Sequence, residues 1–290
     1  MTAVLEAEVR EARKVADAVA RARDLTIREL HEPIEHRDAE RLLGRVWRTG
    51  PASPPVSGDL MRALSHAGAY VAGAFLDDEL VGVTAAFLAN RPGSSAELHS
   101  HITGVVSEVR GRQVGWALKL HQRAWSLERG IESIAWTFDP LVRRNAYFNL
   151  TKLGAHVVSY LVDFYGEMAD GVNAGQGSDR LLVRWPLRAP DVIAAAAGNH
   201  IETPVAAGAT ILDTDGDGRP RRLAMPDGPT IRCAVPADIE GMRLDDPALA
   251  QVWRMEVRAA FEEVLASGAQ VAGVTKDGWY VFTRERKKNR

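Results

Sequence analysis

One stretch of the sequence decides the fold: Val105-Val106-Ser107-Glu108-Val109-Arg110-Gly111-Arg112-Gln113-Val114-Gly115-Trp116-Ala117-Leu118-Lys119-Leu120. An apolar segment typical of a strand runs into a basic, glycine-containing turn, and the turn opens directly into an amphipathic helix. The first amides of such a helix have no acceptor within the helix, and the helix dipole adds partial positive charge there. The junction can therefore bind an anion such as a pyrophosphate through its backbone, and Gly115 would let that anion approach closely.

This turn resembles motif A of the GNAT superfamily of acyl-CoA-dependent N-acyltransferases, R/Q-x-x-G-x-G/A. It fits from Arg110 to Gly115, with Gln113 in place of the middle glycine, and from Arg112 to Ala117 without a mismatch. We prefer the first register, because the preceding residues resemble the family's lead-in V-x-P-E-x-R-G. An ordinary strand-to-helix connection with solvated arginines is the alternative. The resemblance implies acyl-CoA contacts at Val105, Val106, Arg110, Gly111, Arg112, Gln113, Val114, Gly115, Trp116 and Ala117.

A second segment, residues 139–155, is predicted to be a helix with Asp139 at its N-cap, Pro140 at its first position and Gly154 at its end. It resembles GNAT motif B, N-x-x-A-x-x-x-Y-x-x-x-G-F. Alignment on Gly154 places Arg143 on the usual Asn and Leu150 on the usual Tyr. The family's common general acid is therefore missing from its place.

Several side chains could replace that acid or contact the ligands. Tyr147, one turn earlier, and Tyr165 are the candidate acids, although each could be a packed aromatic with a satisfied hydroxyl. Asn145 and Asn149, four residues apart, would share a helix face and contact cofactor or acceptor, or else form solvated surface. Arg180 could bind a carboxylate bidentately beside the loop 169–176, which would overhang the cleft, or could pair with Asp179 or Asp163.

Acyl transfer to an amine needs a base, since an alkylamine has a pKa near ~10. Glu97, His99 and His101 alternate along the strand that enters the turn, so they should point to one face. His101 lies closest to the turn and titrates near neutrality, which makes it the first candidate for the base. Glu97 or His99 would act as a relay, and His99 could also contact substrate. A hydrogen-bonded structural histidine is the alternative for His101.

Further segments resemble a subgroup of long bacterial GNAT proteins that includes amino-acid N-succinyltransferases, and the similarity covers residues 26–187 best. They include Ser100-His101-Ile102-Thr103-Gly104-Val105, Trp136-Thr137-Phe138-Asp139-Pro140-Leu141 and Gly177-Ser178-Asp179-Arg180. This resemblance implies acetyl-CoA or succinyl-CoA as co-substrate and a small amine, such as an amino acid, as acceptor. The departures at Gln113 and Leu150 leave a second class open, a non-catalytic acyl-CoA-binding or assembly protein.

Composition excludes several other classes. A net charge of −2 over 290 residues argues against nucleic-acid binding, which needs a concentrated basic surface. The single cysteine, Cys233, excludes an internal disulfide and indicates a reducing compartment. No apolar run approaches the ~18 residues of a membrane span, and the N-terminus lacks a signal-peptide core. We therefore expect a cytoplasmic protein without a membrane or nucleic-acid partner and without a metal.

The periodicity predicts three parts. Residues 1–24 form a helical arm or homodimer contact, with Val4, Leu5, Val15 and Val19 as its apolar stripe. Residues 25–187 alternate strands and helices in a mixed α/β order, which agrees with the acyltransferase fold that the resemblance implies. Residues 188–290 form a smaller α+β part, with strands at 209–213 and 222–225, a long helix at 246–268 and a closing hairpin at 269–283. Within it, residues 213–218 copy half of an EF-hand loop, but position twelve is Ala224, so a hairpin turn is expected there.

Overall fold

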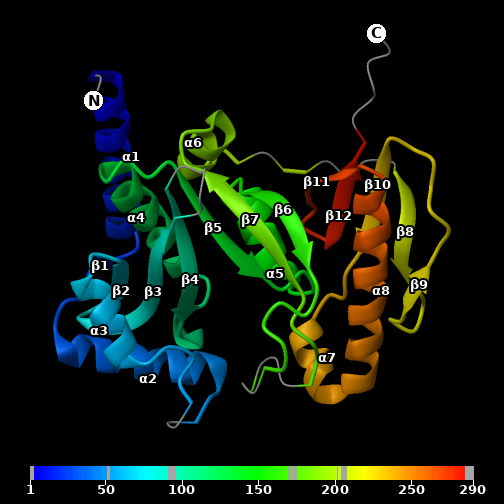
Figure 1. Cartoon of the computed structure of the whole chain (residues 1–290), viewed down its shortest axis with the longest axis horizontal. Helices are drawn as coiled ribbons and strands as arrows, with labels where there is room; N and C mark the ends of the chain where they lie inside the picture. Colours follow the sequence, from blue (N-terminus) through cyan, green and yellow to red (C-terminus); the bar gives the residue numbers. More distant parts are fainter. Residues whose placement is uncertain are drawn as a thin grey trace. The chain divides into compact units, whose positions relative to one another are not determined.

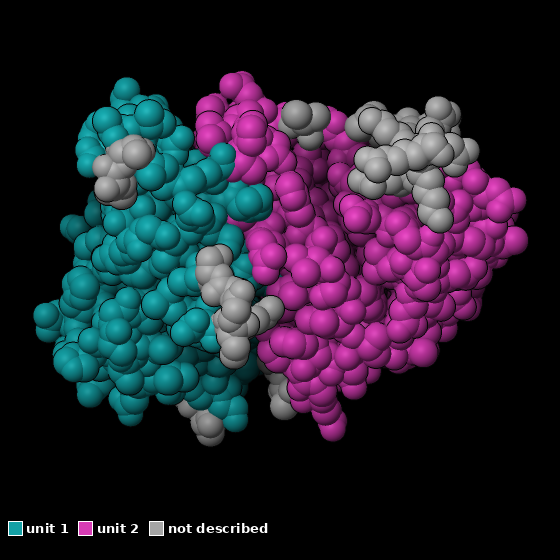
Figure 2. Space-filling model, turned by 45° about the horizontal axis from the view of Figure 1, so that its top comes forward, with its two compact units in different colours: residues 1–136, 170–172, 186–188 teal, residues 137–169, 173–185, 189–290 magenta. Residues whose placement is uncertain are grey.

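A computed structural model gives the conformation of residues 3–50, 53–90, 96–168, 171, 175–200, 202–203 and 208–284. The chain divides into two compact units, coloured separately in Figure 2. Unit 1 comprises residues 1–136, 170–172 and 186–188, and unit 2 comprises residues 137–169, 173–185 and 189–290. The domain boundaries that the sequence predicts after residues 24 and 187 rest on the sequence pattern, whereas the two units are defined by their compactness. The predicted boundaries therefore stay predictions.

The first half of the chain alternates helices and strands (Figure 1). Its elements are α1 (Ala3–Arg21), β1 (Leu25–Glu29), α2 (Pro33–Trp47), α3 (Gly58–His66), β2 (Tyr70–Leu76), β3 (Glu79–Ala89), β4 (Glu97–Val105), a 3-10 turn (Ser107–Val109), α4 (Val114–Glu128) and β5 (Ser133–Phe138). The second half contains α5 (Arg143–Ala146), a π-helical turn (Tyr147–Lys152), β6 (His156–Leu161), β7 (Arg180–Pro186), α6 (Pro190–Ala196), β8 (Ala209–Thr214), β9 (Pro220–Arg222), β10 (Thr230–Ala234), α7 (Ile239–Asp245), α8 (Pro247–Ala266), β11 (Gln270–Val274) and β12 (Trp279–Thr283).

The strands form two sheets. The first has the order β1-β2-β3-β4-β5-β7-β6, and the second has the order β11-β12-β10-β8-β9. In the first sheet β1 to β4 run antiparallel to their neighbours, whereas β4 and β5 are parallel. The predicted fold class, mixed α/β with a smaller α+β part at the C-terminus, is confirmed by these two sheets and their helices.

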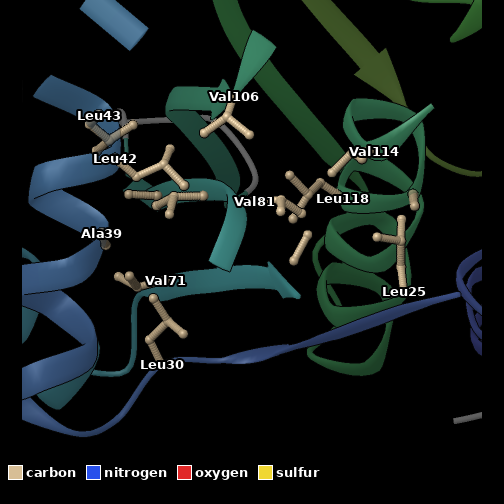
Figure 3. Packing of buried hydrophobic residues seen from close by; sticks show 14 of the residues in the cluster. Leu25, Leu30, Ala39, Leu42, Leu43, Val71, Val81, Val106, Val114 and Leu118 are labelled. Carbon is tan, nitrogen blue, oxygen red and sulfur yellow. The ribbon is translucent and has the colours of Figure 1, made fainter. Parts of the chain in front are cut away.

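Helices cover both faces of the sheet in unit 1. A Cβ atom on Gly104 of β4 would lie 2.8 Å from the Trp47 ring, so this face packs against α2. A Cβ atom on Gly82 of β3 would lie 3.0 Å from Leu118, so the opposite face packs against α4. Both close approaches require a residue without a side chain. The resulting core contains residues from both ends of the basic turn, among them Val106 and Val114 (Figure 3).

Helix α1 packs against α4 (Figure 1). Arg13 of α1 donates two hydrogen bonds to the carboxylate of Glu128, at 2.7 and 2.8 Å. The predicted apolar stripe is only partly right, because Val4 is 68% exposed and the contact uses smaller side chains, which let two helices approach closely. The buried positions of α1 are Ala12, Ala16 and Ala20. The homodimer contact stays a prediction.

Unit 2 contains the second sheet, and α8 packs along it (Figure 1). Phe261 of α8 meets the rings of Tyr280 and Phe282 edge-on, with centroids 4.9 and 5.0 Å apart. The predicted hairpin turn at 213–218 is confirmed, since β8 and β9 pair antiparallel around it. Its second strand ends at Arg222 rather than extending over 222–225, and β10 and α7 were not predicted.

The predicted helix over 139–155 is wrong in its beginning and its form. Only Arg143–Ala146 is α-helical, and a π-helical turn follows over Tyr147–Lys152. Val142 stands at the N-cap, while the Asp139 carboxylate is buried against two arginines from the C-terminal helices. The long-range ion pairs have therefore replaced the local cap. No helix in the described ranges has both the length and the apolar character that a membrane span needs.

Candidate functional site

The basic turn of unit 1 is held by apolar anchors. Val106, Val109 and Val114 are all buried in the core of unit 1, at 6%, 8% and 2% exposure. Between the last two anchors, residues 110–113 are exposed. The Arg112 amide donates to the Val109 carbonyl at 3.2 Å, which closes the turn. The anchors therefore fix the backbone of the turn while leaving its surface accessible.

Backbone amides at the start of α4 are available to a ligand. The first intrahelical hydrogen bond runs from the Ala117 amide to the Gln113 carbonyl, at 3.1 Å. The amides of Val114 and Gly115 precede it, so they have no acceptor one turn back in the helix. Gln113 at the N-cap has φ 58° and its side chain makes no cap hydrogen bond. This left-handed conformation turns the chain so that successive amides form an anion-binding concavity.

Open space lies in front of these amides. A Cβ atom added to Gly115 would meet no heavy atom within 4 Å, and the same holds for Gly111. Gly111 has φ +88°, a conformation that favours glycine. The backbone can therefore be approached at both positions, as a bound phosphate requires.

The charges around the turn favour an anion. Arg110 and Arg112 are exposed, and Arg23 donates a hydrogen bond to the Gln113 side chain. The one acid of the turn, Glu108, is paired with Arg45 at 3.0 Å. Arg110, Gly111, Arg112 and Gln113 are thus exposed beside the first amides of α4, and this basic turn fits an anionic group such as a pyrophosphate. That the predicted residues bind acyl-CoA stays a prediction.

Strand β4 carries a β-bulge just before this turn. Its partner β3 pairs Ala85 with Ile102 and Ala86 with Ser100, which leaves His101 as the extra residue. A bulge bends its strand and re-aims the side chains around it. This irregularity could not be predicted from the sequence, because the residues on both sides of the bulge are ordinary strand residues.

The bulge coincides with the end of the ladder between β4 and β5. The two strands pair in parallel through Leu98 with Ile134 and His99 with Ala135. Among the described residues the ladder stops there. The main chain of β4 from the bulge to Val105 therefore keeps an edge with no β5 partner, where an extended ligand can pair with it.

His101 lies at the bulge with an exposed side chain. Its ring stands 6.1 Å from the His99 ring and 6.0 Å from the Phe87 ring, centroid to centroid. Partial desolvation lowers the pKa of His101 below its ordinary value. A larger share of this imidazole is therefore neutral at pH 7, the form that accepts a proton.

The two other polar residues of the strand differ from His101 in environment. Glu97 is 7% exposed, and its carboxylate accepts a hydrogen bond from Ser133 Oγ at 3.1 Å. His99 is half-buried, with its ring 5.2 Å from the Phe87 ring. The structure therefore brings the two histidines together, while Ser133, which donates to Glu97, lies on β5.

Sequence reasoning missed a buried lysine at the same place. Lys119 of α4 is 5% exposed, and its Nζ donates to Ser100 Oγ at 2.9 Å and to Gln122 Oε1 at 3.1 Å. The ammonium also lies 4.0 Å from the centre of the Trp136 ring. Burial lowers the pKa of Lys119 to about 7. No periodicity could have revealed it, since α4 is buried on nearly every face from Ala117 to Leu127.

The candidate acids both lie in unit 2. The Tyr147 hydroxyl donates to the Glu202 carboxylate, and burial together with this bond raises the pKa of Tyr147 to about 12. Tyr165 is 41% exposed, and its hydroxyl lies 3.1 Å from Thr137 Oγ1. Tyr165 is thus the more accessible of the two hydroxyls.

The remaining candidates of unit 2 fall in three environments. Asn145 is exposed, whereas Asn149 is buried, because the π-helical turn between them changes the spacing of side chains. Arg180 is 6% exposed and lies 5.3 Å from the centre of the Tyr165 ring. The overhanging loop predicted at 169–176 lies largely outside the described residues. Among the residues that the structure describes, no group of three or more His, Cys, Asp or Glu could hold a metal ion.

No protein-family model and no curated protein matches the sequence. Solved acetyltransferases resemble the structure over slightly more than half of the chain. The acetyltransferase of the GNAT family from Streptococcus pneumoniae is 16% identical, with a TM-score of 0.45 over 55% of this chain and 98% of its own. The ribosomal-protein-S18-alanine N-acetyltransferase from Escherichia coli is 13% identical, with a TM-score of 0.45 over 56% and 94%.

A third similar structure, yncA from Salmonella typhimurium, was solved with its cofactor acetyl-CoA. It is 17% identical, with a TM-score of 0.44 over 58% of this chain and 98% of its own.

Proposed function

We propose that this chain is an acyl-CoA-dependent N-acyltransferase that acts on a small amine. One observation carries the proposal: a bulged strand with an unpaired edge leads into an open, basic turn of free amides. A phosphate-bearing group with an extended amide-containing arm matches both parts, because the arm can pair with the strand edge while the phosphates meet the turn. CoA esters have this chemistry.

The turn would hold the pyrophosphate through the amides of Val114 and Gly115, with Arg110 and Arg112 as nearby positive charges. Val105 and Val106 would hold the arm and the acyl carbonyl through main-chain groups, and one amide would donate to the developing oxyanion. When bound, acyl-CoA supplies the acyl group as a thioester. The donor is acetyl-CoA or succinyl-CoA.

Proton transfer is assigned to His101. The amine nitrogen forms a bond to the acyl carbon, the carbon–sulfur bond breaks, the amine proton passes to a base, and the thiolate takes a proton from an acid. His101 fits the base, since it is exposed and its lowered pKa favours the neutral imidazole. His99 would orient it or relay the proton. Of the two candidate acids, Tyr147 is the less suited to donate a proton, because its hydroxyl is bonded to Glu202.

The test is a panel of small amines offered with acetyl-CoA or succinyl-CoA, with release of free CoA thiol as readout. An enzyme releases thiol in proportion to one or more amines beyond the hydrolysis seen without amine. Binding of both CoA esters in calorimetry with no amine-dependent thiol in any pairing would overturn the proposal and favour the non-catalytic acyl-CoA-binding protein. Failure to bind either ester would exclude both functions.

A further inference from the structure

Unit 2 contains an arginine cluster in which, among the described residues, the guanidinium groups outnumber the carboxylates. Its members are four arginines and two buried aspartates: Arg180, Arg243, Arg254, Arg258, Asp139 and Asp179. Arg258 is only half-buried, and the exposed Asp163 adds a negative charge near it. Burying a charge is costly unless it is paired, and a guanidinium cannot escape that cost by losing its proton. An excess of buried guanidinium groups therefore calls for an anion.

Three of the arginines are paired with the two aspartates. Arg254 donates to both Asp139 oxygens, at 2.9 and 2.7 Å, and Arg243 reaches one of them at 2.5 Å. Arg258 donates to both Asp179 oxygens, at 2.9 and 2.6 Å. These are the bidentate contacts that stabilise buried ion pairs best.

Neither aspartate has capacity left for Arg180. The Asp139 carboxylate also accepts the Leu141 amide at 2.9 Å. The Asp179 carboxylate also accepts the Tyr160 hydroxyl at 2.7 Å and the Asp163 amide at 3.0 Å. Each carboxylate thus receives four hydrogen bonds, which is about its full complement.

Arg180 itself has only weak partners. One guanidinium nitrogen donates to the Asp179 main-chain carbonyl at 2.9 Å, and another lies 3.0 Å from the sulfur of Met168, a poor acceptor. No carboxylate of the described residues lies within 4 Å of it. Burial lowers the pKa of Arg180. The positive charges of Arg254 and Arg243 lower it as well, whereas the negative charge of Asp139 raises it.

Arg123 in unit 1 shows how a buried arginine is satisfied structurally without an acid. It is 7% exposed, and two of its guanidinium nitrogens converge on the Leu187 carbonyl at 3.0 and 2.7 Å. Arg180 lacks such a convergent acceptor. Its guanidinium lies beside a thioether, that of Met168, and beside the Tyr165 ring, a residue that is 41% exposed.

We propose that Arg180 binds the carboxylate of a small organic acid. The carboxylate would displace the Met168 sulfur from the guanidinium and accept two parallel hydrogen bonds, with Tyr165 beside it. The Tyr165 ring lies 5.3 Å from the guanidinium carbon, and its hydroxyl bonds the Thr137 hydroxyl at 3.1 Å. Naming that acid as a substrate rests on the proposed function.

Calorimetry with four probes tests the site: succinate and its diamide for the acyl source, alanine and alaninamide for the acceptor source. The wild type should bind one acid roughly tenfold or more tightly than its amide, because the amide leaves the guanidinium unpaired. Arg180→Met should abolish that preference, and Arg180→Lys, which keeps the charge but loses the fork, should retain only part of it. Preference for succinate assigns the carboxylate to the acyl group, and preference for alanine assigns it to the acceptor.

Arg232→Met is the matched control, because Arg232 is a half-buried arginine of the same unit that also stacks on an aromatic ring, Trp279 at 4.9 Å, without an acid partner. It should leave every affinity unchanged. Equal binding of acids and amides by the wild type, or an unchanged preference in folded Arg180→Met, would overturn the site. Arg180-dependent binding of an acid without any thiol release would leave the anion site standing while refuting acyl transfer, so the two failures are distinguishable.

Discussion

The Nζ atom of Lys119 lies 2.9 Å from Ser100 Oγ, which ties α4 to β4 at the residue directly before the bulge. This contact is buried, and it links the helix that presents the free amides to the strand that carries His101. Because burial brings the pKa of Lys119 to about 7, the charge state of this link changes near neutral pH. Protonation of Lys119 should therefore affect both the contact between α4 and β4 and the stability of unit 1.

Lys119→Met should stabilise the protein at and below pH 7. The pKa of Lys119 is lower in the fold than the 10.5 of the unfolded chain, so the unfolded state binds more protons between about pH 7 and 10.5. Stability should consequently rise with pH across that window in the wild type. At about 1.4 kcal/mol per pKa unit, stability should rise by on the order of 3–5 kcal/mol. The contact with the Trp136 ring stabilises the charged ammonium and reduces this rise.

Urea unfolding at pH 6, 7.5 and 9 measures this slope, which Lys119→Met should remove. Lys14→Met is the control, since Lys14 of α1 is exposed and makes only a 3.9 Å surface contact with Glu11. It should keep the wild-type slope. A Lys119→Met slope equal to that of the wild type would show that Lys119 stays charged in the fold.

Gly115→Asp should abolish binding of acyl-CoA while preserving the fold. The new Cβ atom would meet no heavy atom within 4 Å, so the substitution causes no clash. Its carboxylate would nevertheless place negative charge where the free amides of α4 receive a phosphate. Calorimetry with CoA should show a loss of at least roughly 100-fold in affinity, equivalent to about 2.7 kcal/mol.

Gly216→Asp is the control for that experiment. Gly216 also has open space around its Cβ position and lies in the turn between β8 and β9 of unit 2. It should bind CoA like the wild type. Unchanged CoA affinity in folded Gly115→Asp would remove the turn as the pyrophosphate site.

The sequence predicts the turn well because the turn depends on local chemistry. Strand propensity before Val106, glycines at 111 and 115 and an amphipathic helix after Gln113 are all visible in neighbouring residues. The bulge at His101 depends instead on pairing between strands. It forms because Ala85 and Ala86 of β3 pair with Ile102 and Ser100, which leaves His101 without an opposite residue in β3. Gln113 adopts φ 58°, a left-handed conformation that is uncommon for residues other than glycine, so the sequence did not indicate it.

Unit 2 was harder to predict because its decisive contacts span long separations. Asp139 has the local sequence of an N-cap, directly before Pro140, yet its partners Arg243 and Arg254 lie more than 100 residues later. Such pairing leaves no periodic trace in the sequence. The short strand β10 and helix α7 were missed for a related reason, since each is stabilised by packing in the second sheet and against α8 rather than by its own pattern.

His101→Gln should lower kcat by roughly 10²–10⁴ while acyl-CoA binding persists, the effect of losing a general base. A base must be neutral, so kcat/KM should fall as pH falls through the pKa of His101. Desolvation lowers that pKa, which places the acid limb of the profile below pH 6.5. The variant should lack this limb.

His66→Gln, a change at an exposed histidine of α3 in the same unit, should keep both the rate and the limb. A structural histidine would behave differently from a base at position 101. The His101→Gln variant would then show reduced stability but near-normal turnover of its folded fraction, and the pH profile would be unchanged. That outcome would assign the base elsewhere.

Asp139→Asn should destabilise unit 2 by about 3–5 kcal/mol, because it leaves two buried guanidinium groups, those of Arg243 and Arg254, without a counter-charge. Burial disfavours the charged carboxylate, but the two arginines outweigh burial and hold the pKa of Asp139 well below its usual range. The stabilisation is therefore complete above the unfolded pKa of about 4 and is lost as pH falls toward the folded pKa.

The control is Asp213→Asn, which removes an equivalent ion pair at the surface, Asp213 with Arg221 at 3.0 Å. An exposed pair contributes about 0–1 kcal/mol, so this variant should unfold at nearly the wild-type urea concentration. Between pH 5 and 3 the wild type and Asp213→Asn should lose stability more steeply than Asp139→Asn, which has no carboxylate left to protonate at that site. Equal urea midpoints for the two variants at pH 7 would mean that the buried pairs do not hold α7 and α8 against the segment after β5.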